Sequence, residues 1–180
     1  MKFLIASDIH GSARYARELV AAFDREGASR LILLGDILYH GPRNDLPEEY
    51  APKAVIALLS ERKEQILCVR GNCDTEVDQM VLPFPILADY AILPVGDRLA
   101  YLTHGHVFNG GHLPPLQKGD VLIHGHTHVP LCDVREDVTI LNPGSTSIPK
   151  EGSWHGYLTL ENGHFRWMDF GGVCHREFTL

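Results

Sequence analysis

The stretch KFLIASDIHGSARYARELVAAFDREGASRLILLGD, residues 2–36, predicts an α/β fold. A short apolar run at residues 2–7 is followed by a segment whose apolar residues recur at helical spacing: Ala16, Leu19, Val20 and Phe23. Gly27 closes this segment, as glycine commonly does at the end of a helix, and a second apolar run follows. The order strand, helix, strand is expected of a parallel βαβ unit.

The alternation continues through the first half of the chain and then stops. Residues 52–63 predict a second helix and residues 65–72 a third strand. After about Leu82 come short strand-like runs without convincing helices between them: 90–95, 98–105, 120–125 and 138–145. Asn162-Gly163 joins two further runs as a hairpin. The second half is therefore expected to be mostly antiparallel β.

Composition sets the size and the compartment. With 180 residues, 44% of them hydrophobic and 22% charged, the chain is expected to form one domain over 1–180. The N-terminal apolar run is too short for a signal peptide, and no stretch approaches the roughly 18 apolar residues of a membrane span. Four cysteines without CxxC spacing indicate free thiols. We expect a cytoplasmic protein without a membrane partner.

The formal net charge of −7, without any long run of Lys and Arg, argues against a nucleic-acid polymer as partner. A small phosphorylated substrate held by metal ions is compatible with this charge. The apolar segments 80–87 and 110–116 leave two readings open. They are either subunit contacts of a homo-oligomer or walls of a substrate groove.

Polar side chains follow five of the predicted strands: Asp8 and His10, Asp36, Asn72 and Asp74, His104 and His106, and His124, His126 and His128. A single histidine in a loop is usually solvated, but three within five positions are poorly explained that way. Strand ends are where α/β folds commonly assemble their sites, and residues at i and i+2 of an extended chain point to the same side. Carboxylate, amide and imidazole groups without a cysteine favour Mn²⁺, Fe²⁺ or Zn²⁺. The set exceeds what one tetrahedral ion requires, which indicates two ions.

The ordered series DIH (8–10), GD (35–36), GN (71–72), THGH (103–106) and GHTH (125–128) resembles the calcineurin-like metallophosphoesterase superfamily. Within it, GDILYHGPRN (35–44), RGNCD (70–74) and NPGSTSIPK (142–150) are similar to small bacterial phosphodiesterases of the YfcE type. The resemblance runs from Met1 to about Lys150.

This resemblance implies a β-sandwich of two mixed sheets flanked by helices, in α/β/β/α layers. It also implies a site for two divalent ions, with Mn²⁺ expected first and Zn²⁺, Fe²⁺ or Mg²⁺ as alternatives. The implied ligands are Asp8, His10 and His128 for the first metal, Asn72, His104 and His126 for the second, and Asp36 between them.

The implied activity is hydrolysis of a phosphodiester in a small substrate by a metal-activated water. The chain departs from the commoner pattern at Cys73, where many members have a histidine thought to assist the leaving group. A thiol suits that proton transfer poorly at neutral pH. His106 and Asp74 are alternative candidates because they are close in sequence. Arg43 either binds a substrate phosphate together with Asn72 or is solvated.

The sequence leaves alternative functions to consider. A phosphomonoesterase or nucleotide pyrophosphatase would use the same metal ligands. A scaffold that binds proteins, as the retromer subunit of this fold does, would have lost ligands, whereas every expected position is filled here. A metallo-β-lactamase-like hydrolase is excluded because its HxHxDH run is absent. His124 is expected to be a packing residue, and Asn142 to cap a turn.

Overall fold

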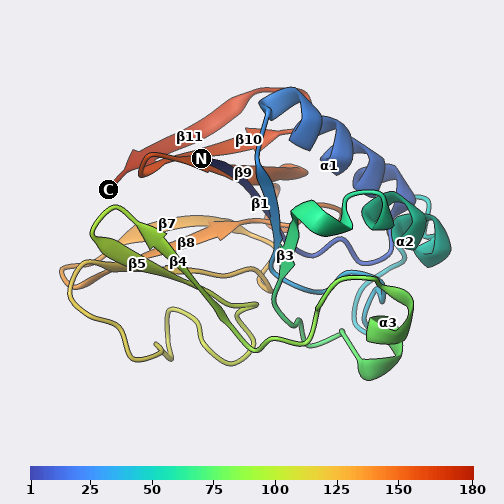
Figure 1. Cartoon of the computed structure of the whole chain (residues 1–180), viewed down its shortest axis with the longest axis horizontal. Helices are drawn as coiled ribbons and strands as arrows, with labels where there is room; N and C mark the ends of the chain where they lie inside the picture. The colour runs from blue at the N-terminus through green and yellow to red at the C-terminus, as the bar shows by residue number, and fades with distance from the viewer.

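The structure, a computed structural model, describes residues 1–180 and begins with the predicted alternation of strands and helices (Figure 1). The elements are β1 (Lys2–Ala6), α1 (Ala13–Glu26), β2 (Arg30–Leu33), α2 (Pro52–Ser60), β3 (Ile66–Cys68) and α3 (Glu76–Val81). Helix α1 begins where the Ser12 side chain accepts a hydrogen bond from the Tyr15 backbone N–H. It ends at Gly27, whose φ of 61° is the left-handed conformation that glycine adopts at low cost.

The second half consists of strands: β4 (Ala91–Val95), β5 (Arg98–Leu102), β6 (Asp120–Ile123), β7 (Pro130–Val134), β8 (Val138–Pro143), β9 (Gly156–Glu161), β10 (His164–Asp169) and β11 (Cys174–Thr179). The predicted hairpin joins β9 to β10, with positive φ at both Asn162 and Gly163.

Two mixed sheets result. The six-stranded sheet has the order β11-β10-β9-β1-β2-β3, and the five-stranded sheet has the order β4-β5-β6-β8-β7. Strands β1, β2 and β3 are parallel, as predicted. The second half is mostly antiparallel, but β5, β6 and β8 pair in parallel. Their crossovers are the loop 103–119 and the edge strand β7, so a prediction based on helical crossovers could not find this pairing.

The core lies in two layers, one on each face of the six-stranded sheet. Between the sheets, Ile5, Trp167 and Phe165 are fully buried against the inner face of the five-stranded sheet. On the outer face, Leu4 and Leu31 pack with the apolar sides of α1 and α2. Successive side chains of β1 point to opposite faces of the sheet, so this strand contributes to both layers of the core.

The two mixed sheets and flanking helices agree with the expected α/β fold. All three α-helices lie before β4 in the chain. The outer-face residues Leu122 and Ile140 of the five-stranded sheet are buried against the helix-free loop 103–119, including Leu116. This loop therefore covers these residues of the outer face.

Three elements were not expected from the sequence: α3, β7 and β11. Helix α3 is six residues long and buries none of its side chains, so it lacks an apolar stripe, and a capping box between Thr75 and Asp78 stabilises its start. Strand β11 is exposed at the edge of its sheet. Hydrophobic periodicity cannot detect elements that bury so little.

All four cysteines are free, as expected. None of the three α-helices has the length and apolar composition that a bilayer crossing requires.

Candidate metal centre

The loops after β1 and β2 are hydrogen-bonded to each other and fix the first predicted ligands. The backbone N–H of Asp8 donates to Gly35 O at 3.1 Å, and that of His10 donates to Asp36 O at 2.9 Å. Asp8, His10 and Asp36 have φ angles of 59°, 48° and 55°, which side-chain-bearing residues rarely adopt. This backbone turns all three side chains to one place.

The loop after β6 lies against the loops that follow β1 and β2. The His126 backbone N–H donates to Asp8 Oδ2 at 3.0 Å, and the Gly125 N–H donates to His104 O at 2.7 Å. Gly125 is required because a Cβ there would overlap the Ser7 side chain. The buried Asn142 amide donates to Gly125 O at 2.8 Å and accepts from the Gly144 N–H, so it both caps a turn and holds this loop.

One group of polar atoms is formed by Asp8, His10 and His128. Asp8 Oδ1 lies 3.3 Å from His128 Nε2 and 3.6 Å from His10 Nε2, and the two imidazole nitrogens are 3.2 Å apart. All three side chains are buried.

A second group is formed by Asn72, His104 and His126. His104 Nε2 lies 3.0 Å from Asn72 Oδ1 and 3.2 Å from His126 Nδ1. Asp36 Oδ2 lies between the groups, 3.4 Å from His104 Nε2 and 3.7 Å from His10 Nε2. The structure thus brings the seven predicted ligands close together, and their division between two ions stays a prediction.

The imidazole orientations are fixed by backbone carbonyls behind the site. The Nδ1 atoms of His10, His104 and His128 each lie 2.7 Å from a carbonyl oxygen, of Tyr39, Leu34 and Ile148 respectively. A carbonyl only accepts, so each Nδ1 carries the proton and each Nε2 presents its lone pair to the site. This arrangement is typical of histidines that bind metals.

The donor set fits divalent cations. Three Nε2 lone pairs converge without a donor between them, and Asp8 Oδ1 is buried with no hydrogen-bond partner. Lone pairs and an unsatisfied carboxylate oxygen at such distances repel one another unless a cation lies among them. The oxygen and nitrogen ligands suit Mn²⁺, Fe²⁺ and Zn²⁺. The Cys73 sulfur also lies within 4.8 Å of ligand atoms of His10 and Asp36.

Without metal ions, only protons can balance the negative charge of the Asp8 and Asp36 carboxylates, and the pKa values of Asp8 and His104 are shifted. Burial raises the pKa of Asp8, but the His10 and His128 imidazoles close to its carboxylate outweigh burial and hold that pKa well below the usual value. Burial disfavours the His104 imidazolium, but the hydrogen bond to Asp36 and the Asp8 charge raise the pKa of His104 to about 9. The site therefore attracts positive charge.

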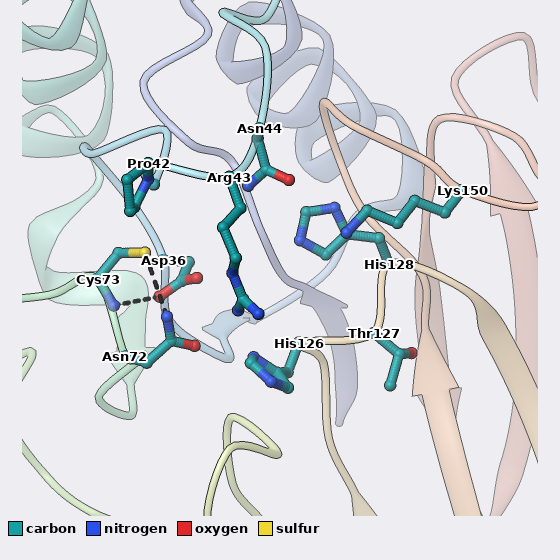
Figure 2. Close-up of a pocket in the computed structure, with 11 residues that line it drawn as sticks. Asp36, Pro42, Arg43, Asn44, Asn72, Cys73, His126, Thr127, His128 and Lys150 are labelled. Atoms are coloured by element: carbon teal, nitrogen blue, oxygen red, sulfur yellow. Dashed lines mark hydrogen bonds between the residues drawn. The ribbon is translucent and has the colours of Figure 1, made fainter.

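An open pocket of about 360 Å³ lies over this centre (Figure 2). Its walls are Asp36, Gly41, Pro42, Arg43, Asn44, Asn72, Cys73, His126, Thr127, His128 and Lys150. The Arg43 side chain extends toward the gap between Asn72 and His126 (Figure 2). The apolar segments 80–87 and 110–116 do not line this pocket.

The three candidates for leaving-group assistance lie in different places. Cys73 lines the pocket, and burial and the Asp36 charge raise the pKa of its thiol to about 12. His106 is exposed beside the pocket, its ring centroid 5.4 Å from that of His104. Asp74 lies outside the pocket, fully engaged by backbone N–H groups of Asp36, Ile37 and Gly71.

Sequence reasoning gave no role to Lys150, although the stretch that ends in this residue was part of the resemblance. Lys150 lines the pocket from the loop after β8. His124 is buried outside the pocket, which agrees with the packing role expected for it.

Known proteins resemble this chain in sequence and in fold. The family model described as the calcineurin-like phosphoesterase superfamily domain matches residues 1–163. The phosphodiesterase YfcE of Escherichia coli is 48% identical over 162 residues, covering 90% of this chain and 88% of YfcE. The phosphodiesterase MJ0936 of Methanocaldococcus jannaschii is 26% identical over 171 residues, covering 88% and 87%.

A solved structure of E. coli YfcE superposes with a TM-score of 0.96 at 43% identity and covers 99% of each chain. The vacuolar sorting protein Vps29 of Chaetomium thermophilum superposes with a TM-score of 0.63 at 14% identity, covering 99% and 97%. The second likeness concerns the fold alone.

Proposed function

This chain belongs to the calcineurin-like phosphoesterase superfamily, and we propose that it is a phosphodiesterase that hydrolyses a small phosphodiester at a centre for two divalent ions. The observation that carries the proposal is the pair of ligand groups with Asp36 Oδ2 between them. Identity to the E. coli phosphodiesterase over most of both chains supports the same activity.

Asp8, His10 and His128 would hold one ion and Asn72, His104 and His126 the other, with Asp36 shared between them. Two divalent ions in such a centre would polarise the phosphate. They would also lower the pKa of a bound water, so that hydroxide is available near neutral pH. We propose Mn²⁺ as the physiological ion because the ligands are oxygens and imidazoles, although Zn²⁺, Fe²⁺ and Mg²⁺ share part of this preference.

The protein groups orient the substrate and the ligands. Arg43 binds a non-bridging oxygen of the scissile phosphate, for which its planar guanidinium is suited. Carbonyls of Tyr39, Leu34 and Ile148 hold the three imidazoles with Nε2 facing the site. Water oxygen forms a bond to phosphorus, and the bond from phosphorus to the leaving oxygen breaks.

The pocket thiol does not supply the leaving-group proton in this proposal, because a pKa of about 12 makes Cys73 a weak acid at neutral pH. His106 is the remaining candidate beside the pocket. His106→Ala is expected to lower kcat while metal content, measured by elemental analysis, is unchanged. Full kcat in a variant that retains both metals would remove His106 from the mechanism.

The proposal is tested by hydrolysis of bis(p-nitrophenyl) phosphate and p-nitrophenyl phosphate with metal-stripped protein, after addition of Mn²⁺, Zn²⁺, Mg²⁺ or no metal. We expect Mn²⁺ to restore activity and the diester to be hydrolysed faster than the monoester. Asp36→Asn should abolish activity. Asp45→Asn, an exposed carboxylate further along the same loop that does not line the pocket, should leave it unchanged.

Faster hydrolysis of the monoester would instead identify a phosphomonoesterase. No hydrolysis with any metal, from protein shown to bind two ions, would favour a protein-binding scaffold of this fold.

A further inference from the structure

The two cationic side chains of the pocket have no carboxylate partner. Eight of the sixteen Lys and Arg residues of the chain lie within 4.0 Å of a carboxylate oxygen, and Arg43 and Lys150 are not among them. Asp36 is the only carboxylate among the lining residues, and it belongs to the candidate metal centre. The pocket therefore presents two unpaired positive charges to whatever it binds.

The backbone of Lys150 is fixed beside the candidate metal centre. Its N–H donates to His128 O at 3.1 Å, and its carbonyl accepts from Ser153 N at 3.0 Å and from Ser153 Oγ at 2.6 Å. The loop that carries it is anchored to the β1 end, because Ser145 Oγ donates to Asp8 O at 2.9 Å. The Cα position is held on both sides, and only the side chain remains free to follow a ligand.

The two cations enter the pocket from different sides. Arg43 comes from the loop that also carries Pro42 and Asn44, whereas Lys150 reaches in from the side of His128 (Figure 2). One guanidinium can hold one phosphate through two oxygens. A lysine is a separate, flexible point charge, so it is available for a second anion.

A phosphodiester carries a single negative charge at its scissile phosphorus, and Arg43 with the candidate metal centre already opposes it. The volume of about 360 Å³ lies within the range of small-molecule sites, roughly 300–1,000 Å³, so the pocket holds more than a scissile phosphate. An unpaired charge therefore remains at Lys150, and the pocket has space beyond the scissile phosphate.

We propose that Lys150 is a specificity-determining residue that binds a second anionic group, a phosphate or carboxylate, carried by the substrate away from the scissile bond. The preferred substrate is then a phosphodiester with an additional phosphate or carboxylate. This inference rests on the proposed phosphodiesterase function and adds the substrate class to it.

Two chromogenic substrates differ only in the second anion: the p-nitrophenyl ester of thymidine 5′-phosphate, and the same diester with a 3′-phosphate. Release of p-nitrophenolate reports scissile-bond cleavage in both. Wild-type protein with Mn²⁺ should prefer the 3′-phosphorylated diester by about tenfold in kcat/KM, mainly through KM, as expected for one charge-assisted contact.

Variants separate the two cations. Lys150→Met should bring the preference close to one, and Lys150→Arg, which keeps the charge, should retain most of it. Arg43→Met should lower kcat/KM on both diesters alike and leave their ratio unchanged. Lys53→Met removes another unpaired, exposed lysine that lies outside the pocket and should change neither rate.

Binding gives a second measurement that does not require turnover. Calorimetric titration of Mn²⁺-loaded protein with thymidine 3′,5′-bisphosphate should show binding that Lys150→Met weakens about fivefold or more and that Lys53→Met does not. An active wild type without preference, or a preference that survives Lys150→Met, would overturn the role of Lys150 alone. Inactive wild type with every metal, but with Lys150-dependent bisphosphate binding, would overturn the phosphodiesterase function instead.

Discussion

Left-handed backbone is concentrated at the candidate ligands. Eight residues other than glycine have positive φ, and five of them are predicted metal ligands: Asp8, His10, Asp36, His126 and His128. Each such residue costs roughly 1–2 kcal/mol, so the chain sacrifices stability at this site to aim its side chains. The hydrogen bonds that oppose this cost come from neighbours that do not face the pocket.

Asp74 is the clearest of these neighbours. Its Oδ2 accepts from Gly71 N at 2.7 Å and Asp36 N at 2.8 Å, and its Oδ1 accepts from Ile37 N at 3.0 Å. Asp74→Asn places an amide N–H₂ against a buried N–H, so we expect a loss of about 1–3 kcal/mol in the free energy of unfolding. Denaturant unfolding in EDTA measures this loss.

Calorimetry should show weaker Mn²⁺ binding in the same variant, because Asp36 is displaced. Asp97→Asn, in an exposed turn, is the matched control. Wild-type stability and Mn²⁺ affinity combined with a reduced kcat would instead support the catalytic role that sequence proximity suggested for Asp74.

Gly71 allows the loops after β2 and β3 to approach each other. A Cβ at this position would overlap the Oδ1 and backbone N of Asp36. Gly71→Ala should therefore destabilise the protein by about 1–3 kcal/mol and displace a predicted shared ligand. Gly111→Ala, where the nearest atom to a new Cβ is Asn109 Oδ1 at 3.4 Å, should stay within about 0.5 kcal/mol of wild type. Equal melting temperatures for the two variants would contradict this account of Gly71.

The sequence was sufficient to predict which residues meet, because the ligands sit at strand ends in an ordered series of motifs. It was not sufficient to predict how they are aimed. The Ile148 carbonyl that orients His128 and the backbone bond that fixes Lys150 both come from a loop some 20 residues further on. Such contacts depend on how β8 returns beside β6, and local patterns carry no information about that return.

At the scale of elements, α1 is tied to β1 by a partly buried polar contact. Glu26, at the helix end, accepts from Lys2 Nζ at 2.5 Å and from the Tyr157 hydroxyl at 3.0 Å. Burial raises the pKa of the Glu26 carboxyl, but these hydrogen bonds outweigh it, and the pKa lies below its usual value. The carboxylate is thus better stabilised in the folded than in the unfolded chain.

Glu26→Gln should lower the free energy of unfolding at pH 7 by about 1–3 kcal/mol, the size expected for hydrogen bonds to a charged group. A lowered folded-state pKa contributes stability above the unfolded value, and this contribution is lost as pH falls through the folded value. The difference between wild type and variant should therefore shrink below about pH 4. Urea unfolding at several pH values checks this, with Glu18→Gln, exposed on the same helix, as control. A difference independent of pH would contradict the assignment.

The elements with strong apolar periodicity were predictable, and the others were not. Helix α1 buries a continuous apolar stripe, and strands β1 and β2 each bury a continuous apolar run. The bounds of α1 follow from its capping residues, Ser12 and Gly27. Strand β11 and helix α3 bury almost nothing. The parallel pairing of β5, β6 and β8 was missed because their connections contain no helix, which is the usual signal of a parallel crossover.

At the scale of the whole molecule, ion binding at one end of the sandwich should stabilise the entire fold. The site contains converging lone pairs and a buried carboxylate oxygen without a partner, so we expect ions to bind the folded chain and not the unfolded one. At a free Mn²⁺ concentration 100-fold above Kd the stabilisation is about 2.7 kcal/mol, which corresponds to roughly 5–10 °C in Tm for a chain of this size. Differential scanning calorimetry with Mn²⁺ and with EDTA measures this shift. Identical transitions would contradict the proposed metal centre.

The central claim is that phosphodiester hydrolysis requires two ions in this one site. Its most direct test is a titration of metal-stripped protein with Mn²⁺, in which bound ions per chain and bis(p-nitrophenyl) phosphate hydrolysis are measured on the same samples. We predict two ions per chain, with activity rising as the second ion binds and neither property present in Asp36→Asn. Full activity with no bound ion, or with one ion per chain, would contradict the account.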